Sequence, residues 1–113
     1  MLKKIECFIQ PCKLEEVKNA LIEAGAEGIT MSEVSGFGKQ RGYIAVDIPD
    51  KHVKFLPKVK LEIIVDEEIL DNIINKIVHL SKTGEFGPGK IFILPVEDAI
   101  RIRTQESGIN AIV

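Results

Sequence analysis

Apolar and polar residues alternate most clearly in two segments of the chain, residues 3–10 and residues 58–65. In the first segment Ile5, Cys7 and Ile9 share one face, and the second repeats the pattern with Val, Leu and Ile. Strict alternation places every second side chain on the same side of an extended backbone. Both segments are therefore predicted to be strands with one well-buried face.

Two other segments carry apolar residues at helical spacing. Leu14, Val17 and Leu21 share one helical face, and Gly25 follows them as a stop signal. A second stripe follows Asp66, whose side chain is predicted to cap the helix. This stripe consists of Ile69, Leu70, Ile73, Ile74, Ile77 and Val78. Both stripes predict amphipathic helices packed on the sheet.

The rest of the chain supplies two more strands and a long loop. Residues 28–38 and 90–95 are predicted as strands, whereas residues 39–54 lack a clear period. After the last strand we expect a short helical turn, an extended stretch and a mobile tail, at residues 96–100, 101–103 and 105–113. The order βαββαβ is typical of the α+β ferredoxin-like sandwich. A chain of 113 residues is expected to form one domain, residues 1–113.

The sheet face away from the helices is predicted to be half apolar. Phe8, Ile64 and either Phe92 or Ile91 fall on it. A surface of this kind is seldom left in water. The pattern therefore predicts an oligomer in which copies of the chain cover this face.

Composition narrows the class of protein. With 45% hydrophobic and 28% charged residues, the chain has the balance of a soluble globular protein. A net charge of −2 argues against a general nucleic-acid binder. No apolar run is long enough for a membrane span, and the first residues lack the apolar core of a signal peptide. We therefore expect a cytoplasmic protein without direct membrane insertion.

The sequence offers no arrangement that is typical of catalysis or of a metal site built by the chain alone. Cys7 and Cys12 do not form a C-x-x-C pair, and Cys7 is expected to be a buried small hydrophobe. His52 and His79 have no clustered partner. No nucleophile can be matched with a base, so we expect no enzyme.

The strongest chemical signal is a glycine-rich loop at residues 83–90, which ends in Lys90 and precedes a strand. Glycines let backbone N–H groups approach an anion, and Arg101 and Arg103 follow with further positive charge. The spacing differs from a P-loop, whose lysine opens a helix. Two interpretations stay open for the loop alone, a phosphate cradle and a surface turn that needs glycine.

Several distinctive blocks follow one another over nearly the whole length of the chain. They are Lys3-Lys4-Ile5, Pro11-Cys12-Lys13-Leu14, Glu33-Val34-Ser35-Gly36-Phe37-Gly38-Lys39-Gln40, Phe55-Leu56-Pro57-Lys58-Val59-Lys60-Leu61-Glu62, the glycine loop with Lys90-Ile91-Phe92, and Arg101-Ile102-Arg103-Thr104. Together these blocks resemble the PII signal-transduction protein family. The resemblance implies a homotrimer that binds ATP or ADP in the clefts between subunits. The implied nucleotide-binding positions are Gly28, Ile29, Thr30, Gly38, Lys39, Gln40, Glu62, Ile64, Gly87, Pro88, Gly89, Lys90, Arg101 and Arg103.

The resemblance also implies a second ligand and a protein partner. In many members Mg²⁺ and ATP complete a site for 2-oxoglutarate, here Gln40, Arg41, Gly42 and Lys58, with Gln40 near the metal. Three functional loops are implied, a T-loop at about residues 39–54, a B-loop at about 82–90 and a C-terminal loop at about 101–113. The T-loop would dock on a target such as an ammonium transporter or a nitrogen-metabolism enzyme.

The chain departs from the family pattern at several of these positions. Lys51 stands where many members carry a modifiable tyrosine, and Tyr43 lies near the base of the T-loop, so tyrosine nucleotidylylation is expected to be absent. Gln10 replaces a basic residue, which weakens the case for 2-oxoglutarate more than for ATP. Lys39 loses the bidentate fork of the usual arginine, and Pro88 removes one N–H donor.

Three functions remain possible at this point. The first is a non-enzymatic regulator that senses adenylates. The second is a small nucleotide-hydrolysing enzyme that uses the same cleft, with Glu85 as its one candidate for positioning water. The third is a structural trimer with a vestigial site, against which the set of loop glycines and basic residues argues.

Overall fold

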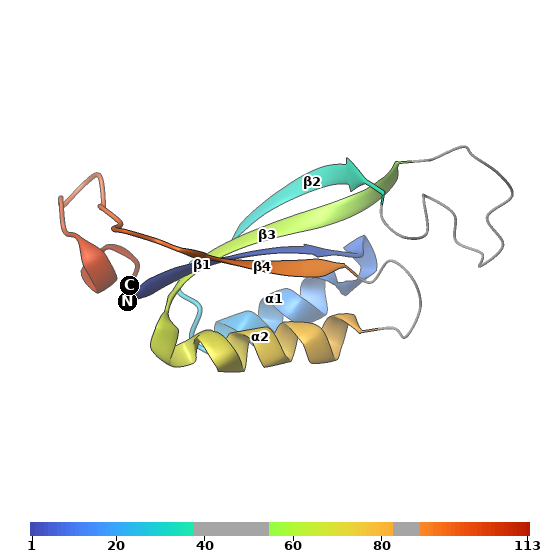
Figure 1. The fold of residues 1–113 in the computed structure, drawn as a ribbon, viewed down its shortest axis with the longest axis horizontal. Coiled ribbons are helices and arrows are strands. Elements are labelled where there is room, and N and C mark those ends of the chain that lie inside the picture. Colours follow the sequence, from blue (N-terminus) through green and yellow to red (C-terminus); the bar gives the residue numbers. More distant parts are fainter. Residues whose placement is uncertain (38–54, 83–88) are drawn as a thin grey trace, which may run out of the picture.

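The computed structural model describes residues 1–37, 55–82 and 89–113. The strands are β1 (Leu2–Ile9), β2 (Thr30–Gly36), β3 (Leu56–Asp66) and β4 (Lys90–Pro95), and the helices are α1 (Leu14–Glu23) and α2 (Glu67–Ser81). The strands form one antiparallel sheet in the order β2-β3-β1-β4, and both helices cover the same face of it (Figure 1). The predicted α+β ferredoxin-like fold is therefore confirmed.

Strand β1 is a central strand, and its alternation sets the register on both sides. Cys7 lies opposite Leu61 of β3 and opposite Ile91 of β4, while Ile5 lies opposite Ile63. Cross-strand partners share a face of the sheet, so these apolar side chains all point toward the helices. The predicted buried face of β1 is confirmed, because Ile5 and Cys7 are fully buried.

The helices bury the stripes that the sequence predicts. Val17 and Leu21 of α1, and Ile73 and Ile77 of α2, are at most 1% exposed and belong to one core cluster with the sheet. Polar residues occupy the outer helix faces, as expected for amphipathic helices packed on one layer. None of the helices in the described ranges combines the length and the apolar character needed to cross a lipid bilayer.

The start of α2 lies where the sequence predicts it, but its capping bonds differ from the expected ones. Asp66 occupies the N-cap position but makes no side-chain capping bond. Its Oδ1 lies 3.4 Å from the Met1 ammonium, and the Glu67 backbone N–H donates to the Met1 carbonyl oxygen at 2.9 Å. The predicted N-cap position is confirmed, but the Asp66 side chain does not bond the helix backbone, because β1 pairing, with Leu2 opposite Asp66, brings Met1 to this helix end.

The predicted helical turn at residues 96–100 is not formed. Asp98 Oδ1 instead accepts hydrogen bonds from the backbone N–H groups of Ala99, at 2.8 Å, and Gly108, at 3.0 Å. The Gly108 N–H also donates to the Ala99 carbonyl oxygen at 3.0 Å. A short acidic side chain that bonds nearby backbone groups competes with a helical turn. The chain therefore closes a loop at this point.

The end of the chain also differs from the expected extended stretch and mobile tail. The Arg101 N–H donates to the Glu106 carbonyl oxygen at 2.9 Å, and the Gln105 N–H donates back to the Arg101 carbonyl oxygen at 2.7 Å. Residues 102–104 form a turn, and Gly108–Ala111 forms a 3₁₀ helix. Both predictions were wrong, because these bonds join residues without any periodic apolar pattern.

The sheet face away from the helices carries most of the apolar residues predicted for it. Phe8 and Phe92 lie there and contact each other edge to face, with ring centroids 6.1 Å apart. Ile64 shares this face, since it lies opposite Lys4. Ile91, the alternative candidate, instead faces the helices and packs on the core. Oligomerisation through this face stays a prediction.

The two cysteines are expected to differ sharply in reactivity. Burial raises the pKa of the Cys7 thiol to about 11, whereas Cys12 is exposed. Because the thiolate is the reactive form, an aromatic disulfide reagent at about pH 8 should label one thiol per native chain and two after unfolding. The Cys12→Ser variant should be unreactive when folded, and rapid labelling of that variant would contradict the burial of Cys7.

Candidate functional site

The basic residues predicted to bind phosphate lie at opposite ends of β4. Lys90 opens the strand opposite Phe8, and Pro95 closes it. At a rise of about 3.3 Å per residue, the strand separates its ends by about 16 Å. Arg101 and Arg103 lie beyond Pro95, in the C-terminal segment at the far side of the molecule from the start of β4 (Figure 1). One chain therefore does not bring these cations together.

Gly89 has a steric reason to be glycine. Its φ is +115°, and a Cβ built on it would lie 1.7 Å from the carbonyl oxygen of Phe8. The backbone before Lys90 therefore runs directly against β1, and no other residue fits there without displacing backbone atoms. The side chain of Lys90 is exposed next to this contact.

The two arginines differ in their surroundings. Arg101 is partly buried, and its guanidinium donates a hydrogen bond to the backbone oxygen of Val113. Arg103 is exposed in the turn that follows.

The predicted adenosine-binding residues lie toward the opposite edge of the sheet. Thr30 opens β2 and lies opposite Glu62 of β3. Ile29 packs against the core, and Gly28 is exposed with no atom within 4 Å of an added Cβ. Since β2 and β4 form the two edges of the sheet, this group is separate from Lys90 within one chain.

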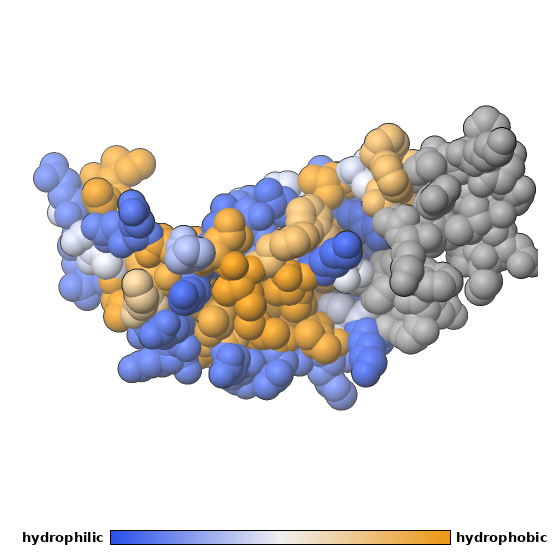
Figure 2. Space-filling view, viewed as in Figure 1, coloured by the Kyte–Doolittle hydropathy of each residue, from blue (hydrophilic) through white to orange (hydrophobic). Residues whose placement is uncertain are grey.

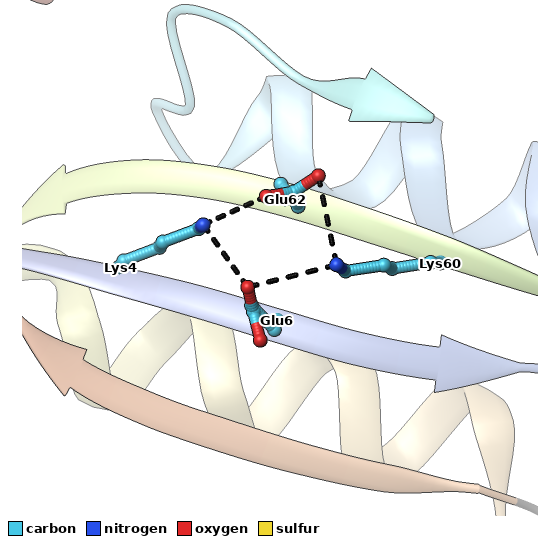
Figure 3. A network of polar contacts seen from close by, with 4 residues as sticks. All are labelled: Lys4, Glu6, Lys60 and Glu62. Atoms are coloured by element: carbon cyan, nitrogen blue, oxygen red, sulfur yellow. Dashed lines mark ion pairs between the residues drawn. The ribbon is translucent and has the colours of Figure 1, made fainter. Parts of the chain in front are cut away.

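Glu62 belongs to a ring of four charged residues on the uncovered sheet face (Figure 3). Lys4 Nζ lies 2.7 Å from Glu62 Oε2 and 3.0 Å from Glu6 Oε2. Lys60 Nζ lies farther away, 3.7 Å from Glu6 Oε2 and 3.9 Å from Glu62 Oε1. Two ammonium groups and two carboxylates thus alternate around the ring, and their charges cancel.

The ring changes the pKa of two of its members. The hydrogen bond from Lys4 lowers the pKa of Glu62, and the same bond, together with the one to Glu6, raises the pKa of Lys4. Both shifts favour the charged forms, because each charge is held against an opposite one. Sequence reasoning picked out Glu62 but missed Lys4 and Lys60 as its ion-pair partners.

Part of the predicted site lies outside the described residues. These positions are Gly38, Lys39, Gln40, Arg41, Gly42, Gly87 and Pro88, together with Tyr43 and Lys51 of the T-loop. Lys58 is partly buried on β3, opposite Val34. Within residues 1–37, 55–82 and 89–113, no three His, Cys, Asp or Glu side chains gather in a way that suits a metal ion.

A cavity of about 400 Å³, which sequence reasoning did not predict, lies beside β4 and the C-terminal half of α2. It is lined by Phe8, Ile9, Ile74, Ile77, Val78, Ser81, Lys82, Gly89, Lys90, Ile91 and Ile93. Figure 2 shows apolar side chains gathered over this same edge. The signal in the sequence was the unbroken apolar run of residues 91–94, because such a run places apolar side chains on the helix side of β4 as well as on its other face.

Comparison with known proteins fits this fold. The family model described as Nitrogen regulatory protein P-II matches residues 2–106. Proteins of that name from Bradyrhizobium diazoefficiens and Nostoc punctiforme are 48% and 49% identical over 112 residues, which is 98% of this chain and 100% of each relative. The chain belongs to the P-II family. This confirms the resemblance drawn from the sequence motifs.

The P-II assignment extends to the three-dimensional structure. The solved structure of Arabidopsis thaliana PII bound to citrate has a TM-score of 0.79 and 40% identity, and the match covers 97% of this chain and 91% of that one. The P-II relatives are named as nitrogen regulatory proteins, so the chain is a member of a family of signal-transduction regulators.

Replacing Gly89 of this P-II protein with alanine should cost about 2 kcal/mol or more of unfolding free energy. The positive φ disfavours any Cβ, and the Phe8 carbonyl oxygen leaves no room for one. Gly28→Ala is the matched control, since a Cβ there meets open space. Urea unfolding without ligand measures both, and equal stabilities of the two variants would contradict the steric role of Gly89.

Glu62→Gln should destabilise the protein in a pH-dependent way. The hydrogen bond from Lys4 lowers the pKa of Glu62 in the folded state. The ion pair therefore stabilises the fold at pH values above the usual carboxyl pKa. This stabilisation is lost as the pH falls through the lowered pKa of the folded state. The gap between wild type and variant should therefore be present at pH 7 and narrow below about pH 4. Urea unfolding at both pH values tests this, and a constant gap would contradict it.

Proposed function

We propose that this P-II protein is a non-enzymatic regulator that binds ATP or ADP in clefts between three copies of the chain. The observation that carries the proposal is the separation of Lys90 from Arg101 and Arg103 at opposite ends of β4. A triphosphate needs several cations around one short chain of oxygens. Because a single chain does not bring these side chains together around one ligand, a second copy would have to supply the missing cations.

The surface around β4 supports such an assembly. Ile93 and Val78 are about half exposed beside the cavity, at 49% and 47%, and Phe92 is 49% exposed on the other side of the same strand. An apolar edge with exposed backbone groups is a surface that proteins usually cover. A neighbouring copy that covers β4 would also bring its own residues close to Lys90.

The site would then be shared in the following way. One chain would offer the backbone around Gly89 and the ammonium of Lys90 to the phosphates, with Gly87 and Pro88. A neighbour would add Arg101 and Arg103. Adenosine would lie against Gly28, Ile29 and Thr30 at the start of β2 and against Glu62 and Ile64 of the adjacent β3, with Gly38, Lys39 and Gln40 nearby.

Magnesium and 2-oxoglutarate belong to the same proposal. Mg²⁺ binds mainly to phosphate oxygens and takes few protein ligands, so Gln40 alone would suffice on the protein side. Lys58 offers a cation for a carboxylate of 2-oxoglutarate, with Arg41 and Gly42 alongside. Ligand binding would order the T-loop, at about residues 39–54, which would then dock on a target in the cytoplasm such as an ammonium transporter or a nitrogen-metabolism enzyme.

Mixing two defective variants tests the shared site. Lys90→Ala and Arg101→Ala should each weaken ATP binding by about 2 kcal/mol or more, because a desolvated phosphate charge loses its partner. If the two residues act from different copies, trimers formed from an equal mixture should recover about a quarter of the wild-type sites. Calorimetric titration of the mixture, unfolded and refolded together, counts these sites.

A mixture of Arg101→Ala with Arg103→Ala is the matched control. Both arginines would come from the same copy, so this mixture should recover no complete site. Recovery by neither mixture, although wild type binds ATP, would place the whole site within one chain and contradict the proposal. Phosphate release measured in the wild-type sample tests the non-enzymatic part, since steady hydrolysis would favour the enzyme.

A further inference from the structure

The charged ring on the uncovered sheet face is not symmetrical. Lys4 makes two short contacts, at 2.7 and 3.0 Å, whereas both contacts of Lys60 are 3.7 Å or longer. Charged hydrogen bonds between nitrogen and oxygen are typically about 2.7–2.9 Å long. Lys4 is therefore the member of the ring that fixes Glu62 in place (Figure 3).

The two oxygens of the Glu62 carboxylate have different surroundings. Oε2 accepts from Lys4, while Oε1 lies 3.9 Å from Lys60 Nζ, which is beyond hydrogen-bond range. A carboxylate only accepts hydrogen bonds, so Oε1 retains acceptor capacity for a donor on a ligand. The Glu62 side chain is 27% exposed, so a ligand on this face can reach it.

The neighbours of Glu62 match one kind of ligand. Thr30 lies across from it on β2, and Ile64 follows two positions along β3 on the same face. A hydroxyl, a carboxylate and an aliphatic side chain in one row suit a flat apolar group that carries hydroxyl or amino donors. The adenosine part of a nucleotide has these properties.

We propose that Lys4 is a positioning residue for nucleotide binding, which holds Glu62 Oε2 so that Oε1 is presented to a hydroxyl or amino hydrogen of adenosine. This inference rests on the proposed function. Lys4 itself would touch no ligand. Without Lys4, the Glu62 and Glu6 carboxylates would have only the more distant Lys60 as a countercharge. Repulsion from Glu6 would then turn the Glu62 side chain away.

The experiment compares two lysines of the same ring. Lys4→Met should weaken ATP binding by about tenfold in calorimetric titration, because one charged hydrogen bond that orients an acceptor is lost. Lys60→Met removes the same chemical group from the same face and should weaken binding by less than about threefold, since its contacts are long. Lys4→Arg restores the charge and should bind ATP within about threefold of wild type.

A double-mutant cycle separates positioning from a general structural effect. In a Glu62→Gln background, Lys4→Met should add no further loss of ATP affinity, because the group that it orients is already altered. Thermal unfolding and light scattering of each variant verify folding and assembly. Should Lys4→Met fail to fold, Lys4→Gln, which keeps an N–H donor without the charge, enters the same cycle.

The outcomes are distinct. Equal ATP affinity of Lys4→Met and wild type would overturn the positioning role, and so would an equal loss in Lys60→Met. If Lys4→Met lowers ATP affinity in the Glu62→Gln background by as much as it does in the wild type, Lys4 acts by another route, and this result also overturns the positioning role. A wild-type protein that binds no adenine nucleotide would overturn the proposed function itself, and that result is visible before any variant is made.

Discussion

The antiparallel pairing of β1 with both β3 and β4 is the constraint on which the rest of the structure depends. This strand supplies the fully buried Ile5 and Cys7, and each of them is matched by an apolar partner on β3. A shift of one residue in this register would turn every core side chain of β1 to the other face. The same register sets Lys4 beside Glu62, so the core and the charged ring are fixed by one set of backbone bonds.

The topology also explains why the candidate site is dispersed. In the order β2-β3-β1-β4, the segment before β2 and the start of β4 belong to opposite edges of the sheet, and the chain after β4 leaves at the far end of that strand. No side-chain movement in one chain reunites Lys90 with Arg101 across the length of β4. A sheet of this kind can gather such residues only where one copy meets the next. The fold therefore makes assembly a requirement of the proposed site.

The sequence predicted the elements whose signal is periodic and failed where the partner is distant. The strands around Ile5 and Ile63, and the helical stripe that contains Ile73, follow from period alone. The N-cap position of Asp66 was also predictable, but its contact with Met1 was not, because Met1 reaches that helix end only through tertiary pairing. Lys4 was missed for the same reason. Alternating charges were visible in both strands, but only the register shows that they meet.

The ring also bears on how the uncovered face could be covered. Buried single charges are costly, whereas a set of opposite charges that already bond to one another carries most of its compensation with it. Lys4, Glu6, Lys60 and Glu62 neutralise each other within one chain, so a neighbour that covers this face would not need to bring countercharges. Phe8 and Phe92 beside the ring can then supply the apolar contact area for a pairing between copies.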